Sequence, residues 1–97
     1  MNQIEEIISK LREIMPVLAK EYKVKALEAF GSYARSEQGK RSDVDILVEF
    51  YETIDLFAFV ELEEFLSEVL GIKVDLVMKD TLKPRIKEKI LREAIPI

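Results

Sequence analysis

The chain contains no cysteine and no histidine. Without cysteine it can form no disulfide, no thiolate zinc site and no cysteine nucleophile. Without histidine it lacks a Ser-His-Asp triad and an imidazole base. Any catalysis must therefore use carboxylates, lysine, arginine, hydroxyls, backbone amides or a bound metal. Oxygen ligands of this kind favour magnesium or manganese.

Long apolar runs are also missing. No stretch approaches the roughly 20 apolar residues that a membrane-spanning helix needs. Glu5 and Glu6 do not fit a secretory signal, so the expected location is the cytoplasm. The 97 residues are enough for one small domain, residues 1–97, with a single core.

Charge is unevenly distributed along the chain. The net charge of −4 and the isoelectric point near 4.9 argue against direct nucleic-acid binding. Residues 46–70 include seven acidic residues and no lysine or arginine, whereas residues 79–93 include six basic and three acidic ones. This asymmetry is suited to steering a charged ligand or partner, although a solvated surface is the commoner explanation.

The spacing of apolar residues predicts alternating helices and strands. Helices are expected at residues 2–21, 33–38, 54–70 and 82–93, and strands at residues 24–30, 44–50 and 72–78. Pro16 predicts a kink or break near residues 12–15 of the first helix. Ser32 is the expected N-cap of the short helix, Asp80 or Thr81 that of the last one, and Gly71 ends the third.

The connection between the second and third strands is long enough to contain a helix. Strand–helix–strand units in one sheet are nearly always parallel and right-handed. These two strands should therefore be parallel neighbours, which would place Asp75 beside Asp43 and Asp45.

The pattern with the clearest chemical meaning joins Gly31-Ser32 to Asp43-x-Asp45. Alternate residues of a strand share a face and lie roughly 6.6 Å apart, so the two carboxylates can share a pair of divalent ions about 3.5–4 Å apart. Gly31-Ser32 places free N–H groups at a helix start, where phosphate binds readily. The combination indicates phosphoryl or nucleotidyl transfer. The alternative is a polar strand face beside an ordinary turn, with Ser32 only a cap.

Three further residues have competing interpretations. Arg35 either binds phosphate or anchors the short helix by pairing with Glu37 or Asp43. Ser42 either orients Asp43 by hydrogen bonding or has no role. Asp75 is either an isolated polar residue or a third site carboxylate, and its expected place beside the aspartate pair favours the site.

These residues together carry a family resemblance. Gly31-Ser32-x-Ala34-Arg35, then Ser42-Asp43-x-Asp45-Ile46 and later Val74-Asp75-Leu76-Val77, resembles the nucleotidyltransferase pattern of the DNA polymerase β superfamily. The length and the ending at residues 82–94 are similar to minimal nucleotidyltransferases, called MNT proteins. One departure is Ser36, where the family often has glycine after the arginine.

The resemblance implies a fold, a cofactor and site roles. The fold would be α+β, a small mixed sheet of three to four strands packed with helices. Asp43, Asp45 and Asp75 would be catalytic and would hold two Mg²⁺ ions, with Asp75 helping to deprotonate the acceptor hydroxyl. Gly31 and Ser32, with Arg35 and Ser42, would bind the triphosphate of ATP.

The resemblance also implies a partner. MNT proteins resemble antitoxins that are encoded beside HEPN toxins, and these toxins are RNases. Such an antitoxin transfers AMP from ATP to a tyrosine hydroxyl of its toxin. Two other hypotheses are a binding module that blocks its toxin sterically and an enzyme that modifies a small molecule. A chain of 97 residues has little room for a separate acceptor domain, which favours a macromolecular acceptor. Self-association stays open.

Overall fold

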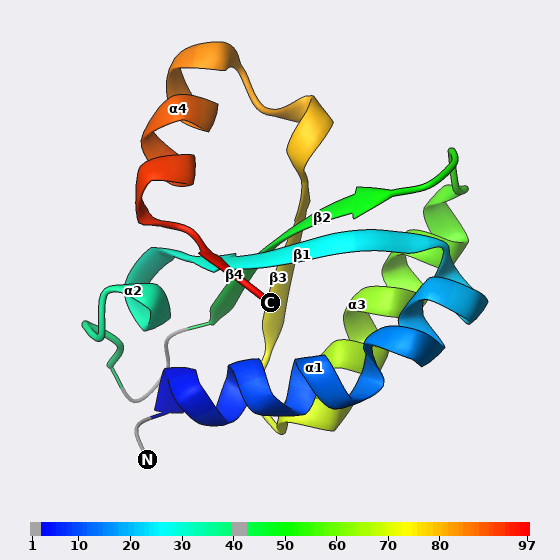
Figure 1. The fold of residues 1–97 in the computed structure, drawn as a ribbon, viewed down its shortest axis with the longest axis horizontal. Helices are drawn as coiled ribbons and strands as arrows, with labels where there is room; N and C mark the ends of the chain where they lie inside the picture. Colours follow the sequence, from blue (N-terminus) through cyan, green and yellow to red (C-terminus); the bar gives the residue numbers. More distant parts are fainter. Residues whose placement is uncertain (1–2, 40–42) are drawn as a thin grey trace.

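The computed structural model describes residues 3–39 and 43–97. The elements in chain order (Figure 1) are α1 (Gln3–Tyr22), β1 (Val24–Phe30), α2 (Gly31–Ala34), β2 (Val44–Phe50), α3 (Leu56–Leu70), β3 (Val74–Met78), the 3₁₀ turn η1 (Lys79–Thr81), α4 (Pro84–Glu93) and β4 (Ile95–Pro96). The predicted α+β class is confirmed. No helix in this described part of the chain is long and apolar enough to cross a membrane.

The strands form one mixed sheet in the order β3-β2-β1-β4. β2 and β3 are parallel, as predicted, and β1 is antiparallel to both β2 and β4. The sequence did not predict β4, because a two-residue strand containing Pro96 carries no readable alternation. It nevertheless pairs with Glu28 and Ala29 and covers that edge of β1.

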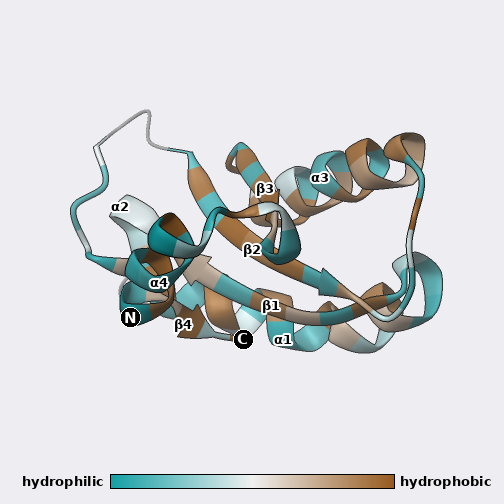
Figure 2. Ribbon diagram, turned by 90° about the horizontal axis from the view of Figure 1, so that it is seen from above, coloured by the Kyte–Doolittle hydropathy of each residue, from teal (hydrophilic) through white to brown (hydrophobic). Residues whose placement is uncertain are grey.

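One face of the sheet forms the main hydrophobic core. Helices α1 and α3 cover this face, and in Figure 1 both lie below β1. Leu27 and Ala29 of β1, Ile46 and Val48 of β2, and Leu76 of β3 point into it. Apolar residues dominate β2, which is largely brown in Figure 2.

The opposite face carries polar side chains at alternate positions. Asp45, Leu47 and Glu49 of β2 share this face because successive side chains of a strand alternate. Leu47 is only 1% exposed although it does not belong to the main core. Helix α4 stands on the other side of β1 from α1 in Figure 1 and contains no buried residue.

Of the kink or break predicted near residues 12–15, the break does not occur. Helix α1 continues through Pro16 to Tyr22. Leu11 and Leu18, on either side of the proline, are both fully buried. Their packing in the core outweighs the missing N–H group of Pro16 and keeps the residues after it helical.

The ends of α3 follow the sequence closely. Asp55 is the N-cap and its side chain accepts a hydrogen bond from the N–H of Ala58 at 2.8 Å. Gly71 ends the helix in the left-handed conformation, as predicted.

The start of α4 differs from the prediction. Asp80 and Thr81 do not cap it, because they lie in the preceding 3₁₀ turn, where the Thr81 hydroxyl donates to the Met78 carbonyl at 2.8 Å. The helix begins at Pro84 instead, with Lys83 as its N-cap.

Strand β3 is an edge strand, and α3 satisfies its outer N–H groups. The N–H of Val74 donates to Ser67 Oγ and the N–H of Leu76 donates to Glu63 Oε2, both at 2.9 Å. Unpaired edge groups would be a template for pairing with another chain. The two side chains remove that template and fix the distance between α3 and β3.

Replacing Ser67 with Ala should lower the free energy of unfolding by about 1–3 kcal/mol, because a part-buried N–H group loses its acceptor. Urea unfolding would measure the loss, and the Val74 amide should exchange its hydrogen faster. Glu64→Ala, at an exposed position of the same helix, is the matched control and should change stability little. Equal stability of the two variants would show that the Ser67 contact is unimportant.

Candidate active site

Asp45 and Asp75 are brought together by the parallel pairing of β2 and β3. The two residues are direct partners in the register, so their side chains share the polar face of the sheet. Burial raises the pKa of Asp45, and the neighbouring Asp75 adds to this through charge repulsion and a hydrogen bond. Asp43 raises the pKa of Asp45 further, while Arg35 lowers it. These effects show a local excess of negative charge around Asp45.

Asp43 lies just before β2 and points partly elsewhere. Its Oδ2 atom is 3.9 Å from Lys73 Nζ, and its side chain is 42% exposed. Lys73 immediately precedes β3, so this ion pair links the starts of the two parallel strands. Asp43 thus lies close enough to affect the pKa of Asp45, but its own ion-pair partner is Lys73.

Gly31 lies against the carboxylate of Asp45. It has a φ angle of +74°, and a Cβ atom at this position would collide with Asp45 Oδ2. The pairing of Phe30 with Asp45 explains this closeness, because Gly31 is the next residue along the chain. A side chain would fill the space beside the aspartate pair, so the glycine keeps this corner open.

Helix α2 begins at Gly31, two residues earlier than an N-cap at Ser32 would allow. Phe30 is its N-cap and offers no side-chain hydrogen bond, so Ser32 lies inside the first turn and the predicted cap is wrong. The helix ends at Ala34, well before Gly39, because Ser36 adopts a left-handed φ of 58°. Gly31 and Ser32 still occupy the predicted strand-to-helix turn.

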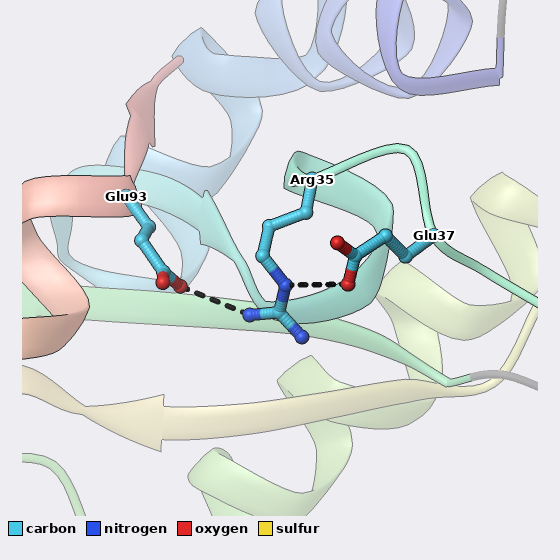
Figure 3. A network of polar contacts seen from close by, with 3 residues as sticks. All are labelled: Arg35, Glu37 and Glu93. Carbon is cyan, nitrogen blue, oxygen red and sulfur yellow. Dashed lines mark hydrogen bonds and ion pairs between the residues drawn. The ribbon is translucent and has the colours of Figure 1, made fainter.

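Arg35 pairs with two carboxylates (Figure 3). Its Nε donates to Glu37 Oε2 at 3.0 Å and its Nη1 donates to Glu93 Oε2 at 2.9 Å. The sequence offered Glu37 as one partner, and the structure contains this pair. Both hydrogen bonds raise the pKa of Arg35, and the bond to Glu37 has the larger effect. The phosphate-binding role of Arg35 stays a prediction, as does that of Ser42, which lies outside the described residues.

Two contributions to this face were not predicted. Glu93, the last residue of α4, is 58 positions from Arg35 in the chain, and no local pattern links them. Lys79 Nζ lies 3.1 Å from Glu49 Oε1 and 3.5 Å from Glu28 Oε2. Alternation along β1 and β2 places these two glutamates on the polar face, but the return of the chain at Lys79 depends on the tertiary fold.

The donor chemistry fits a hard divalent cation. Asp45 and Asp75 supply adjacent carboxylate oxygens whose mutual repulsion a cation would relieve. Within residues 3–39 and 43–97, however, no group of three acidic side chains is arranged to hold one ion. The prediction that Asp43, Asp45 and Asp75 together hold metal ions is therefore not tested by this arrangement, in which Asp43 lies 3.9 Å from Lys73.

The structure thus places the Asp45–Asp75 pair on parallel strands beside the Gly31-Ser32 turn. The nucleotidyltransferase domain family matches residues 8–97. The chain belongs to this family and is an enzyme of the nucleotidyltransferase class.

Curated relatives extend the comparison. MJ0128 of Methanocaldococcus jannaschii is 54% identical over 96 residues, which cover 98% of both chains. The protein adenylyltransferase MntA of Thermococcus cleftensis is 46% identical over 95 residues, covering 98% of this chain and 96% of the relative.

Solved structures share the fold. A chain described as a minimal nucleotidyltransferase superposes with a TM-score of 0.83 at 35% identity, covering 100% of this chain and 97% of the other. A toxin–antitoxin structure with AMP-PNP gives a TM-score of 0.70 at 29% identity, and the match covers 99% of this chain and 72% of the other. The structure of a tri-AMPylated Shewanella oneidensis HEPN toxin in complex with MNT antitoxin gives a TM-score of 0.61 at 26% identity. The match covers 97% of this chain and 67% of the other.

Replacing Gly31 with Ala should destabilise the fold more than replacing Gly71. Both glycines have positive φ angles, but a Cβ at Gly71 would meet nothing within 4 Å. Gly71→Ala should therefore cost only the left-handed strain of about 1–2 kcal/mol. Gly31→Ala adds a collision with Asp45, which costs about 1–3 kcal/mol more and displaces that carboxylate. Urea unfolding would measure the free energy of unfolding of both variants. An equal loss of stability in the two would mean that Asp45 moves aside freely.

The raised pKa of Asp45 predicts a pH-dependent stability. Above its ordinary pKa of 3.8 the folded state holds the proton more tightly than the unfolded state, so stability falls as pH rises through the raised pKa. In EDTA, Asp45→Asn should therefore melt at a higher temperature than the wild type at pH 7, and this gain should vanish below pH 3.8. Asp80→Asn, on exposed η1, is the control. A gain of equal size at every pH would contradict the charge argument.

Proposed function

We propose that this protein transfers AMP from ATP to a hydroxyl of a partner protein, a tyrosine of a HEPN-type toxin, and thereby neutralises it. The observation that carries the proposal is the pairing of Asp45 with Asp75 across parallel strands, next to the Gly31-Ser32 turn. Relatives named protein adenylyltransferase and a neighbour containing an AMPylated HEPN toxin support the reaction and the partner.

The nucleotide would lie at the open corner beside Gly31. The first N–H groups of a helix have no acceptor inside it, and those of α2 would bind phosphate oxygens. The Ser32 hydroxyl, Ser42 and the Arg35 guanidinium are the other phosphate-binding groups that we propose. Arg35 would exchange Glu37 or Glu93 for a phosphate, because charged oxygen acceptors of either kind suit its planar donors. A neighbour containing AMP-PNP supports ATP as the substrate.

Asp43, Asp45 and Asp75 would hold two Mg²⁺ ions. When bound, these ions supply charge neutralisation for the phosphates and for the oxygen that attacks. Asp75 is the most exposed carboxylate of the paired strands, so we assign it the contact with the acceptor hydroxyl. It would accept the hydroxyl proton as the oxygen bonds to the α-phosphorus and pyrophosphate leaves.

Asp75→Asn should separate binding from transfer. The variant keeps Asp45, Ser32 and the fold, so it should still bind AMP-PNP in titration calorimetry with Mg²⁺. Transfer of labelled AMP to the HEPN-type partner encoded nearby should fall by roughly 10²–10⁴-fold, the usual loss when a general base is removed. Intact-mass analysis of the partner would measure it.

Asp80→Asn is the matched control and should transfer normally, because Asp80 lies outside the aspartate pair on η1. Normal transfer by Asp75→Asn would show that Asp75 is structural. A partner that the wild type binds without modifying would instead favour a sterically acting antitoxin.

A further inference from the structure

A group of large apolar side chains is exposed where β2 leads into α3. Tyr51 is 68% exposed, Leu56 72%, Phe57 86% and Val60 42%. We call these four residues the apolar end. Single exposed apolar residues are ordinary, but four of them between residues 51 and 60, one an almost fully exposed phenylalanine, point to an interaction surface. None of the four belongs to the proposed catalytic site.

The helix that follows the apolar end is acidic, although Lys23 lies beside Tyr51, whose N–H donates to the Lys23 carbonyl at 2.8 Å. Residues 46–70 contain no lysine or arginine. Three of their seven acidic side chains have structural partners: Glu49 binds Lys79, Asp55 caps α3 and Glu63 binds β3.

The other four, Glu52, Glu61, Glu64 and Glu68, are exposed and form no ion pair within residues 3–39 and 43–97. Burial raises the pKa of the nearby Tyr22, and Glu61 and Glu68 raise it further, which agrees with a negative local potential.

Helix α4 has the complementary composition. Ile86 is 50% exposed, and no residue of α4 is buried. Its carboxylates are occupied, because Glu88 pairs with Arg92 and Glu93 pairs with Arg35. The basic residues around Ile86 have no ion-pair partner in the part of the chain that the structure describes; they are Lys83, Arg85, Lys87 and Lys89.

The two surfaces match each other but cannot meet within one molecule. Figure 1 shows α4 at the upper left and the start of α3 at the right, on opposite ends of the fold. The apolar end has four exposed apolar side chains and α4 has one, Ile86, and the unpaired charges on α3 and α4 are of opposite sign. A second copy of this chain therefore provides the partner that each surface fits.

We propose that the apolar end of one copy docks on α4 of the next, with Phe57 packed against Ile86 and the free glutamates facing the basic residues of α4. Such a contact joins different surfaces of the two copies, so it is heterologous and can repeat head to tail. It uses no residue of the proposed catalytic site and does not depend on the transfer reaction.

Sedimentation velocity at rising concentrations tests the proposal with the unmodified chain and two variants. The wild type should grow beyond a dimer, whereas Phe57→Ser and Ile86→Ser alone should each sediment as monomers. Loss of a central aromatic anchor should weaken the contact by roughly 30-fold or more. An equimolar mixture of the two variants should form dimers and nothing larger, because only one intact pair of surfaces remains.

Charge reversal gives a second, independent pair of variants. Glu61→Lys and Lys87→Glu should each weaken association, because each places a charge of the same sign opposite the other surface. Glu6→Lys, an exposed substitution in α1, is the matched control and should associate like the wild type. Far-UV circular dichroism confirms that each variant is folded.

Three results would overturn the proposal. The first is a wild type that stays monomeric at every concentration. The second is continued self-association of Ile86→Ser, which would mean that apolar ends pack on each other. The third is a mixture of Phe57→Ser and Ile86→Ser that remains monomeric although the wild type associates.

Discussion

The parallel register of β2 and β3 is the constraint on which the rest of this structure depends. It sets Asp45 directly beside Asp75, and like charges at paired positions destabilise a sheet. The strands stay together because their other face is built from buried apolar residues such as Ile46, Val48 and Leu76. The hydrophobic layer on one side thus holds a repulsive pair in place on the other.

Helix α3 contributes strongly to holding β2 and β3 together. It connects β2 to β3, covers the core with Leu62, Leu66 and Leu70, and hydrogen-bonds the outer edge of β3 through Ser67 and Glu63. Helix α4 is held quite differently. It buries no residue and is tied by the Arg35–Glu93 ion pair and by the short strand β4 that follows it. The fold therefore has one face fixed by apolar packing and one face organised by polar contacts.

The sequence predicted the features that depend on local pattern. Alternation and helical spacing located the three long strands and three long helices, and the strand–helix–strand rule placed Asp75 beside Asp45. It failed where the cause is tertiary. The unbroken α1 depends on packing around Pro16, and β4 exists only because β1 offers a free edge. The bond between Arg35 and Glu93 joins residues far apart in the chain, so no window of sequence could reveal it.

Leu47 separates two polar groups that share one face. The Lys79 cluster with Glu28 and Glu49 lies on one side of it, and the aspartate pair on the other. The buried leucine excludes water and keeps the two groups apart along β2. Lys79 is not among the groups that shift the pKa of Asp45, and its positive charge interacts with its own two glutamates instead. The part-buried Lys79 on this face is thus held by other carboxylates, and the aspartates remain available to attract charges that arrive from solution.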